Sequence, residues 1–362
     1  MNKRGKYILQ IPETESFANA LSKARRDVEQ LAVERGYKPF LFRGLDSAHG
    51  NRLAWVRLGI FCVHDWLRLL FSIPGGSLVL VQYPHMPLKS APIVRFFLPL
   101  IARVKRCAFV AFIHDLDSMR AINGAVAIYS DKKLLQTFQA VVCHNERMQS
   151  ALLSLGIQPD RIFLLHLFDY LCDDVPEKPC TATGGKRMEV AFAGNLSAEK
   201  SAFLYKLPPL LDDTVLLTLY GNGYCEIESS HVQYHGIIPA QKLPATLDAD
   251  FGLVWDGCSA ETCEGPYGLY LALNNPHKVS LYLAAGIPVI IWSGAALAEF
   301  IVGNGLGVSI ASLGELPRTL ADITKSDYRT MRINAQNESQ KVRTGYYFHR
   351  VLCEVEAKWF NE

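Results

Sequence analysis

Short apolar runs that end in polar residues recur along this chain, and segments of helical character separate them. In the first half we expect strands at 6–11, 77–84, 107–115 and 140–145, and helices at 17–35 and 146–155. Consecutive strands can pair in parallel only if a crossover connects them, and the crossover is usually a helix. The pattern therefore predicts a parallel sheet with crossover helices.

The second half repeats this pattern, with strands expected at 189–196, 215–223, 232–238, 251–256 and 288–292. The stretch between the halves, 172–188, is polar and rich in Pro and Gly, as linkers are. At 362 residues the chain exceeds one ordinary core. We therefore expect an α/β protein with two Rossmann-like, doubly wound domains, 1–172 and 189–340, that face each other across a cleft. The last segment, about 327–360, is expected to be helical, and residues 341–362 are expected to cross back to the first domain.

The stretch NNPHKVSLYLAAGIPVII (274–291) begins with polar residues and continues as an apolar helix and a short strand. Asn275 is a good N-cap, and Pro276 suits the first helical position. The first N–H groups of a helix lack internal partners and carry a partial positive charge. With His277 and Lys278 in the same turn, this helix start is typical of a phosphate site. A well-capped core helix whose lysine reaches solvent is the alternative.

Glycine-bearing turns follow two strands of the second half. The stretch FAGNLSAEK places Gly194, Asn195 and Lys200 after the first strand, where backbone can approach a ligand and the lysine can reach a diphosphate. The stretch LYGNGY places Tyr220 and Gly221 after the next strand, where a nucleoside ring can bind. In open α/β sheets ligands bind beyond the carboxyl ends of the strands. Neither turn has the GxGxxG or P-loop pattern, so ordinary strand-to-helix turns are the alternative.

The stretch FIHDLDS places His114, Asp115 and Asp117 at the end of a strand in the first half. Three interpretations are open. The two carboxylates form a DxD sequence that can bind a metal, although no other clustered ligands accompany it. One of them can act as a general base on an acceptor hydroxyl. Either can also cap a helix.

A long polar loop, 255–278, carries Glu261 and Glu264 and leads into the NNPHK helix. Loops longer than about a dozen residues are usually functional or disordered. Carboxylates in this loop can accept hydrogen bonds from sugar hydroxyls, and a solvated surface loop is the alternative.

Two stretches, 51–72 and 93–107, combine arginine and lysine with large apolar side chains. Segments of this kind lie on anionic membrane surfaces. Helices packed on a sheet have a similar composition, so both interpretations stay open.

Composition excludes several classes of protein. A hydrophobic content of 49% with 20% charged residues is typical of a globular protein, and a net charge of +2 gives no reason to expect nucleic acid as a partner. The nine cysteines form no CxxC pair, so we expect reduced thiols in the cytoplasm. The N-terminal stretch MNKRGKYILQIPETES lacks the apolar run of a signal peptide, and no apolar run in the chain reaches the length of a membrane span. Any membrane contact is therefore expected to be peripheral, on the inner face of the cell membrane.

Several of these segments together resemble bacterial β-1,6-galactofuranosyltransferases, which are related to the glucosyltransferases that extend sugar on streptococcal serine-rich adhesins. The similarity is strongest across 189–310, through AFAGNL, DFGLVWDG, CEGPYG, NNPHKVSLYLAAGIPVII and NGLGV. The first half is similar through SKARRDVE, FIHD and VVCHNERM. The resemblance implies a GT-B fold, an inverting mechanism, no cofactor and no metal.

The resemblance also implies a set of site residues. The UDP-sugar is expected to contact Gly194, Asn195, Leu196, Lys200, Tyr220, Gly221, Asp256, Glu264, Asn275, Pro276, His277, Lys278 and Ser280. The acceptor side of the cleft is expected to include Ser16, Asn19, Ser22 and Lys23. The catalytic group is expected among His114, Asp115 and Asp117, with Asp115 the first candidate for the base and Asp117 the second.

We therefore expect a hexosyltransferase that moves a sugar, first of all galactofuranose, from its UDP donor to a hydroxyl of a bacterial surface glycan such as O-antigen, capsule or exopolysaccharide. The acceptor can be lipid-linked, and homo-oligomerisation stays open. The alternatives are a UDP-glucose-type glucosyltransferase of protein O-glycans, an NDP-sugar 2-epimerase, and a noncatalytic nucleotide-binding partner in a glycosylation complex. Incubation with a UDP-sugar and an acceptor separates them by transfer, interconversion or binding alone.

Overall fold

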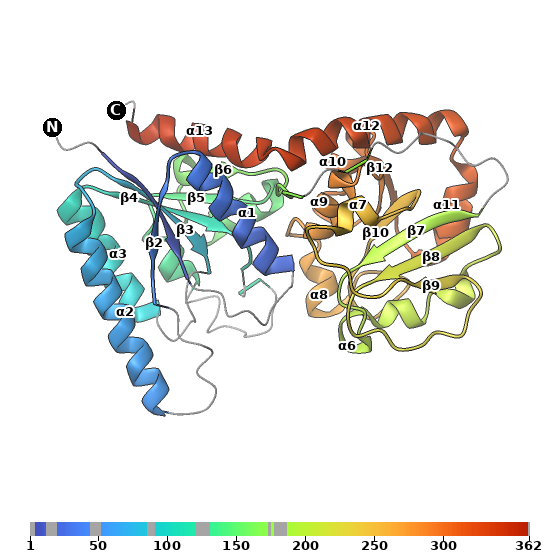
Figure 1. Cartoon of the computed structure of the whole chain (residues 1–362), viewed down its shortest axis with the longest axis horizontal. Coiled ribbons are helices and arrows are strands. Elements are labelled where there is room, and N and C mark those ends of the chain that lie inside the picture. The colour runs from blue at the N-terminus through green and yellow to red at the C-terminus, as the bar shows by residue number, and fades with distance from the viewer. Residues whose placement is uncertain are drawn as a thin grey trace. The chain divides into compact units, whose positions relative to one another are not determined.

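A computed structural model describes most of the chain (Figure 1), namely residues 4–11, 20–43, 52–84, 91–116, 118–119, 131–172, 175–176 and 187–360. The chain forms two compact units. Unit 1 comprises Met1–Leu165 and Phe348–Glu362, and unit 2 comprises His166–Tyr347.

Unit 1 is built on a six-stranded sheet in the order β2-β1-β3-β4-β5-β6, in which every pairing is parallel. Its strands are β1 (Lys6–Gln10), β2 (Lys38–Leu41), β3 (Leu78–Tyr83), β4 (Ala108–Ile113), β5 (Ala140–Cys143) and β6 (Ile162–Leu164). Its main helices are α1 (Ala20–Glu34), α2 (Arg52–Ser72), α3 (Ala91–Lys105), α5 (Glu146–Ser154) and most of α13 (Tyr346–Phe360). Every residue of β3 and β4 is buried, as expected for strands covered on both faces.

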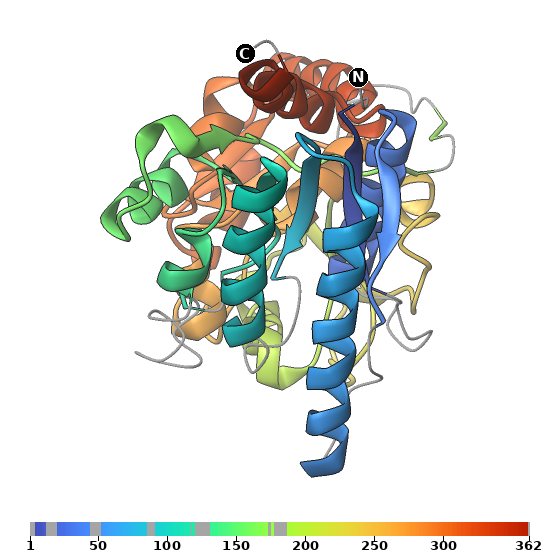
Figure 2. The ribbon, with the colours of Figure 1, turned by 90° about the vertical axis from the view of Figure 1, so that its left-hand side faces the viewer.

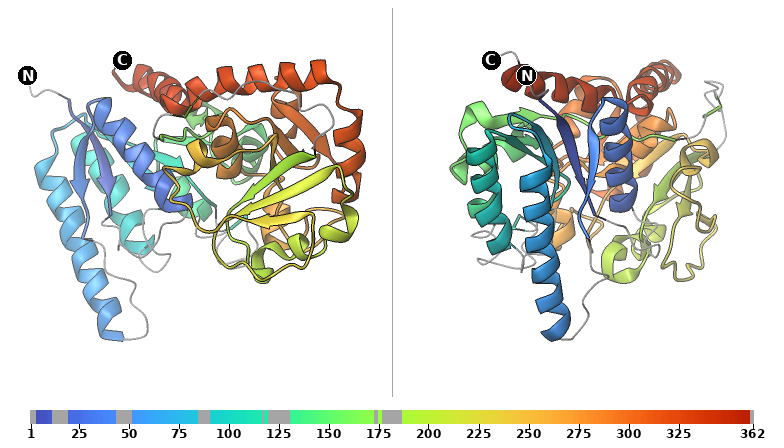
Figure 3. Two further views of the ribbon diagram at one scale, coloured as in Figure 1. Left: turned by 45° about the vertical axis from the view of Figure 1, so that its right-hand side comes forward. Right: turned by 60° about the vertical axis from the view of Figure 1, so that its left-hand side comes forward.

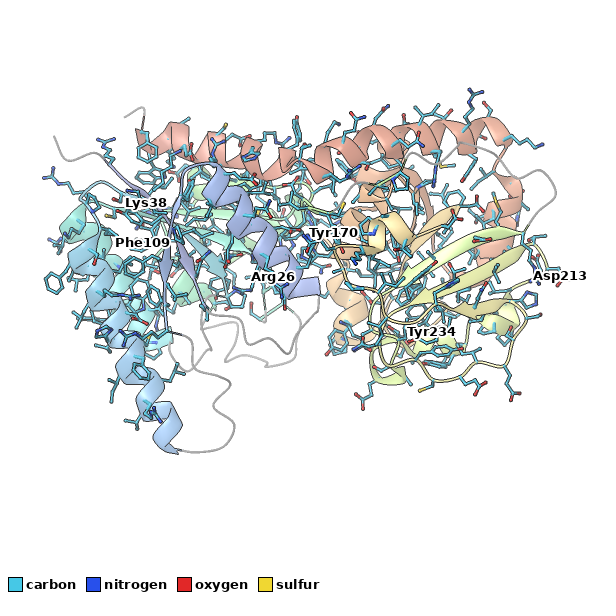
Figure 4. All side chains as sticks on the ribbon, viewed as in Figure 1. Arg26, Lys38, Phe109, Tyr170, Asp213 and Tyr234 are labelled. Carbon is cyan, nitrogen blue, oxygen red and sulfur yellow. The ribbon has the colours of Figure 1, made fainter. Side chains whose placement is uncertain are left out.

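Helices cover both faces of this sheet. Phe109 and Phe112 of β4 lie three residues apart, so their side chains point to opposite faces. The ring of Phe109, labelled in Figure 4, lies 6.1 Å from that of Trp66 on α2, and the ring of Phe112 lies 5.8 Å from that of Phe348 on α13. Figure 2 shows α2 and α3 side by side in front of the sheet. Most of the C-terminal helix therefore packs on this sheet within unit 1.

Unit 2 repeats the design with parallel strands in the order β12-β11-β10-β7-β8-β9 (Figure 3). Its strands are β7 (Met188–Ala193), β8 (Val215–Tyr220), β9 (Val232–Tyr234), β10 (Phe251–Val254), β11 (Val289–Trp292) and β12 (Gly307–Ile310). Its α-helices are α6 (Ala198–Ser201), α7 (Leu243–Thr246), α8 (Gly265–Tyr270), α9 (His277–Ala284), α10 (Ala298–Gly303), α11 (Leu316–Asp322) and α12 (Lys325–Arg343). The prediction of two doubly wound parallel sheets is confirmed.

Three predictions about elements are wrong. The segment 327–360 is two helices, because the chain turns at Gly345, whose φ of +77° favours glycine. The predicted loop 255–278 contains the helix α8. Three short strands were not predicted, namely β2, β6 and β12.

Every cysteine that the structure describes is a free thiol. Burial raises the pKa of Cys62 to about 11, and the pKa values of Cys143 and Cys263 to about 12. These three thiols therefore stay protonated and unreactive near neutral pH. No described helix is both long enough and apolar enough to cross a membrane.

Candidate functional site

The strand order of unit 2 reverses around β7. This first strand of the unit pairs with β8 on one side and with β10 on the other. In open α/β sheets, ligands bind beyond the carboxyl ends of the strands at such a switch point. The loops that follow β7 and β10 begin at Gly194 and Trp255, so ligand binding is expected at these two loops.

Lys278, in the first turn of α9, reaches this edge of the sheet. Its Nζ lies 2.6 Å from Oδ1 of Asp256 and 3.4 Å from the carbonyl oxygen of Trp255. The same atom lies 4.6 Å from the ring centre of Phe192 on β7. The side chains of Lys278 and Asp256 are only 16% and 14% exposed. A charged hydrogen bond and a cation–π contact thus hold the ammonium at the switch point.

Two glycines allow the strand ends to approach each other beside Lys278. Gly194 has a φ of +151° and Gly221 a φ of +139°, both in the region that favours glycine. A Cβ at Gly221 would lie 1.8 Å from the carbonyl oxygen of Gly194. A Cβ at Gly194 would lie 3.3 Å from Cε of Lys278. No other residue fits at Gly221 without moving the backbone.

A buried hydroxyl in the body of α9 anchors the helix to the sheet. Oη of Tyr282 accepts a hydrogen bond from the N–H of Ala193, 2.9 Å away, and donates one to the carbonyl oxygen of Leu253, 3.2 Å away. Its ring covers Gly252, where a Cβ would lie 2.1 Å from the nearest ring carbon. Burial raises the pKa of Tyr282, so the hydroxyl keeps its proton. Because Tyr282 follows Lys278 by about one helical turn, it fixes the position of that lysine.

The predicted N-cap of α9 is wrong. Pro276 occupies the N-cap position, and in the described part of the chain no side chain caps the helix there. Nδ2 of Asn275 instead donates to the carbonyl oxygen of His166, 2.8 Å away. An uncapped helix start of this kind can accept an anion.

Two other residues of α9 contact the beginning of unit 2. Oγ of Ser280 donates to the carbonyl oxygen of Phe168, 2.7 Å away. The ring of His277 lies 4.3 Å from the ring of Phe168. Contact of Ser280 and His277 with UDP stays a prediction.

The loop after β7 is ordered by its own hydrogen bonds. Oδ1 of Asn195 accepts from the N–H of Ser197, 2.9 Å away. Leu196 is fully buried. Nζ of Lys200 lies 5.3 Å from the ring centre of Tyr267. The loop therefore presents a cation beside the turn that carries Gly194.

Aromatic rings surround the end of β8. The ring of Tyr220 stacks on that of His235 at 4.9 Å. The hydroxyl of Tyr234, labelled in Figure 4, donates to the carbonyl oxygen of Gly221, 2.8 Å away. This packing shapes the second predicted glycine turn.

Glu261 and Glu264, the two glutamates of the 255–278 segment, accept hydrogen bonds within unit 2. Sγ of Cys258 lies 3.4 Å from Oε1 of Glu264, and Oγ of Ser312 lies 3.2 Å from Oε2 of Glu261. Neither contact involves Lys278, so these carboxylates are separate from the charged pair at the switch point.

The carboxyl edge of unit 1 carries a chain of buried polar groups. The amides of Gln10 and Gln82 lie 3.1 Å and 3.0 Å from the carboxylate of Glu29, and Oε1 of Gln82 lies 2.8 Å from Nε2 of His114. Because a carboxylate only accepts, the amide nitrogen of Gln82 faces Glu29 and its oxygen accepts from His114. This network assigns the proton of the neutral imidazole to Nε2 and makes Nδ1 its basic nitrogen.

Asp115 is half-buried and follows β4 by two residues. The buried carboxylate of Asp131 contacts residues on either side of Asp115 in the sequence. Oδ2 of Asp131 accepts from the N–H of Ser118, 3.1 Å away, and Oδ1 accepts from the hydroxyl of Tyr83. The first candidate for the base therefore lies three residues before a backbone N–H that Asp131 anchors.

Three predicted site residues lie outside the described residues: Asp117, Ser16 and Asn19. Ser22 is half-buried on α1, and the ammonium of Lys23 is buried against the carboxylate of Asp27 on the same helix. Within the described ranges, no group of three or more His, Cys, Asp or Glu residues could hold a metal. The DxD interpretation depends on Asp117 and stays untested.

Sequence reasoning missed four residues of these networks: Gln10, Glu29, Gln82 and Tyr282. Two of them interrupt apolar runs, since Gln82 lies in SLVLVQYP and Tyr282 in VSLYLAAG. A polar group in a buried run must find a partner. That rule marks Gln82 and Tyr282 in the sequence, but it does not identify their partners.

Two doubly wound parallel sheets, one with a glycine-lined cationic edge and one with a buried histidine that contacts Gln82, form the architecture of the GT-B class of glycosyltransferases. Comparison with known proteins gives the family. The glucosyltransferase 3-like N-terminal domain matches residues 6–167, and the C-terminal domain of the same family matches residues 190–355. The chain belongs to the glucosyltransferase 3-like family and is a glycosyltransferase.

Two relatives and one solved structure illustrate the similarity. Beta-1,6-galactofuranosyltransferase WbbI of Escherichia coli (strain K12) is 38% identical over 257 residues, which are 70% of this chain and 72% of WbbI. Glucosyltransferase 3 of Streptococcus gordonii is 25% identical over 339 residues, 92% of each chain. The structure of HepE from Anabaena in complex with UDP-glucose has a TM-score of 0.63 at 12% identity and covers 97% of this chain and 99% of HepE. HepE therefore shares the fold.

Proposed function

We propose that this enzyme is an inverting glycosyltransferase that moves galactofuranose from UDP-galactofuranose to a hydroxyl of a bacterial surface glycan. The sugar is proposed because WbbI, the relative at 38% identity, is a β-1,6-galactofuranosyltransferase. A UDP-linked donor is proposed because HepE, which has the same fold, binds UDP-glucose.

One observation carries this proposal, namely the cationic edge at the switch point of unit 2. The uncapped start of α9 and the ammonium of Lys278 meet where this type of sheet binds ligands. A leaving diphosphate gains negative charge as its bond to the sugar breaks. Fixed N–H groups and a buried ammonium stabilise that charge, and this proposal requires no metal or cofactor.

The proposed reaction is a single displacement. Asp115 removes the proton of the acceptor hydroxyl while the hydroxyl oxygen attacks the anomeric carbon. The bond between that carbon and the diphosphate oxygen breaks on the opposite face, so the configuration inverts and UDP leaves as an anion. Asp117 is the second candidate for the base. His114, whose Nε2 bonds to Gln82, can supply Nδ1 as a proton acceptor.

A donor screen tests the proposal. The protein is incubated with a glycan acceptor and UDP-galactofuranose, UDP-galactose, UDP-glucose or UDP-N-acetylglucosamine, in the presence of EDTA, and UDP release and product are measured. We expect UDP-galactofuranose to give the highest rate. Loss of all activity in EDTA, restored by Mg²⁺ or Mn²⁺, would assign the DxD carboxylates to a metal. Interconversion of the donor, or binding without transfer, would contradict the proposal.

UDP-glucose is the second candidate donor. It is favoured by the length of the match to glucosyltransferase 3 of Streptococcus gordonii, which spans 92% of each chain at 25% identity. The acceptor would then be a protein-linked glycan. Fastest UDP release from UDP-glucose, with a glycopeptide acceptor, would establish this alternative.

We also propose that unit 1 contacts the inner face of the cell membrane from the cytoplasm, where a lipid-linked acceptor would be presented. The helices α2 and α3 pack on the sheet but keep an apolar surface toward solvent. Val56, Ile60 and Phe71 of α2 are 58%, 61% and 79% exposed, and Phe96 and Val104 of α3 are 64% and 61% exposed. Arginines of the same two helices add positive charge, which favours anionic lipid.

A further inference from the structure

A basic cavity lies at the edge of the unit 1 sheet opposite to His114. It has a volume of about 440 Å³ and is lined by the amino ends of β3 and β4, by the loops before them, by Arg4 and by α13. His114 follows the other end of β4. Because β4 spans six residues, roughly 20 Å separates His114 from the cavity. The cavity is therefore distinct from the edge that carries the candidate base.

Three cationic side chains line this cavity, namely Arg4, Lys105 and Arg106. None of the lining residues is acidic. Nη1 of Arg4 donates to the carbonyl oxygen of Trp359, 3.2 Å away, and Nζ of Lys105 donates to that of Ile73, also 3.2 Å away. These acceptors are neutral. No carboxylate in the described ranges forms an ion pair with any of the three cations. Their charge is therefore available to an anion.

Trp359 of α13 also lines the cavity, and its side chain carries a hydrogen-bond donor. Nε1 of Trp359 is buried and has no acceptor among the described residues. Buried polar groups are almost always hydrogen-bonded, and an exception requires an explanation. An acceptor atom on a bound ligand supplies one.

The backbone of Arg106 provides an independent observation. Its φ is +54°, in the left-handed region that favours Gly and Asn. It directly follows α3, a position that glycine commonly occupies. Glycine would avoid the steric cost, so an arginine here favours a role for its guanidinium.

We propose that this cavity binds a phosphate or diphosphate group, at a site separate from the one at Lys278. Guanidinium groups bind phosphate oxygens in pairs, and the indole N–H of Trp359 donates one further hydrogen bond. The group belongs either to the headgroup of an anionic lipid or to a free phosphate ester. The exposed Phe71 lies four residues before Gly75 of the cavity lining, so a lipid headgroup bound here would bring Phe71 close to the membrane.

Calorimetry with pyrophosphate tests the site. Saturating UDP is present throughout, so that the site at Lys278 is occupied. We expect the wild type to bind, and Arg106→Gln to bind on the order of tenfold more weakly because it loses a charge-assisted contact. Arg103→Gln is the matched control, because it removes an exposed arginine of α3 that does not line the cavity. Equal affinity in the two variants, or no binding by the wild type, overturns the proposal.

Two further measurements separate the explanations. Trp359→Phe keeps an aromatic ring but removes the indole N–H together with the five-membered ring, so it should weaken binding several-fold, and thermal unfolding checks that each variant folds. Sedimentation with phosphatidylcholine vesicles, with and without phosphatidic acid, identifies the source of the phosphate. If Arg106→Gln alone loses binding to the phosphatidic acid vesicles, the source is a lipid headgroup. If Arg106→Gln and Arg103→Gln sediment equally while their affinities for pyrophosphate differ, the source is a free phosphate ester.

Discussion

Lys278 holds its ammonium against a carboxylate, at the edge where we propose that a diphosphate binds. The ammonium has three N–H donors, and the structure uses two of them, toward Asp256 and the carbonyl oxygen of Trp255. One donor remains for a phosphate oxygen. Asp256 therefore orients Lys278 without using up its capacity to bind an anion.

Removing this ammonium should weaken donor binding. Lys278→Ala should lower the affinity for UDP by roughly tenfold or more, since a charge-assisted hydrogen bond contributes about 1.5 to 3 kcal/mol. Transfer should fall with it, and calorimetry with UDP measures the loss. Lys242→Ala, which removes an exposed lysine elsewhere on unit 2, should bind UDP like the wild type. Normal UDP affinity in Lys278→Ala would show that NNPHK is not the phosphate site.

Replacing the candidate base should affect transfer but not UDP binding. Asp115→Asn keeps the shape of the side chain and removes its basicity, so UDP affinity should stay near wild type while transfer drops on the order of 100-fold or more. A transfer assay beside UDP calorimetry measures both quantities. Activity in Asp115→Asn but not in Asp117→Asn would move the base to Asp117. If both variants transfer normally, Glu261 and Glu264 become the next candidates.

At the scale of elements, α9 depends on one hydroxyl for its place on the sheet. Tyr282→Phe leaves the N–H of Ala193 buried without its acceptor, so the free energy of unfolding should fall by about 1 to 3 kcal/mol. Because Lys278 lies one turn earlier, UDP affinity should fall as well. Urea unfolding measures the first effect, and Tyr267→Phe, on a ring that is 40% exposed, is the matched control. Equal stability of the two variants would contradict this role.

One carboxylate of the C-terminal helix contacts three residues near the N-terminus of the chain. Glu356 accepts from Nζ of Lys6 at 3.0 Å, from Nε and Nη2 of Arg35 at 2.9 Å each, and from the hydroxyl of Tyr37 at 3.0 Å. Burial acts to raise the pKa of Glu356. The hydrogen bonds from Arg35 and Lys6 outweigh burial, so the pKa lies below its ordinary value.

This shift makes the contribution of Glu356 depend on pH. A carboxyl whose pKa is lowered in the folded state stabilises that state above its ordinary pKa of about 4.5, and loses this effect as the pH falls through the lower folded value. Glu356→Gln should therefore lower the free energy of unfolding at neutral pH, by roughly 1.5 to 3 kcal/mol. The difference from wild type should shrink below pH 4.5. Unfolding curves recorded across this pH range measure the difference. Glu354→Gln, at an exposed position of the same helix, is the control. A difference between Glu356→Gln and wild type that does not change with pH would rule out this role for the charge.

At the scale of the whole molecule, the exposed apolar side chains of α2 and α3 predict membrane binding. The protein should sediment with vesicles rich in anionic lipid at low salt and be released at high salt, because contacts of basic residues contribute about 1 kcal/mol each and are screened by salt. Phe71→Ser should reduce sedimentation, and Leu153→Ser, on an exposed apolar residue of α5, should not. No sedimentation of the wild type at low salt would leave α2 and α3 as ordinary packed helices.

Local patterns in the sequence were enough to predict much of the fold. The buried strands β3 and β4 lie within the predicted runs 77–84 and 107–115, since a short apolar run bounded by polar residues is typical of a strand that is covered on both faces. The helix of NNPHK and the strand after it were also predicted, because Gly286 favours the left-handed conformation that ends a helix and has a φ of +65° in the structure. These features depend on residues within a few positions of one another.

Only the tertiary structure decided which of these residues meet. The strand order that places β7 between β8 and β10 brings the loop after each strand to one edge, and no local period encodes that order. The pair of Lys278 with Asp256 joins residues 22 positions apart, and the chain from Glu29 through Gln82 to His114 crosses three elements. Such partners are chosen by packing and by the need of each buried polar group for a hydrogen bond, which act between segments far apart in the sequence. The sequence thus determined the elements and the class of enzyme, and the tertiary structure determined the contacts of its charged groups.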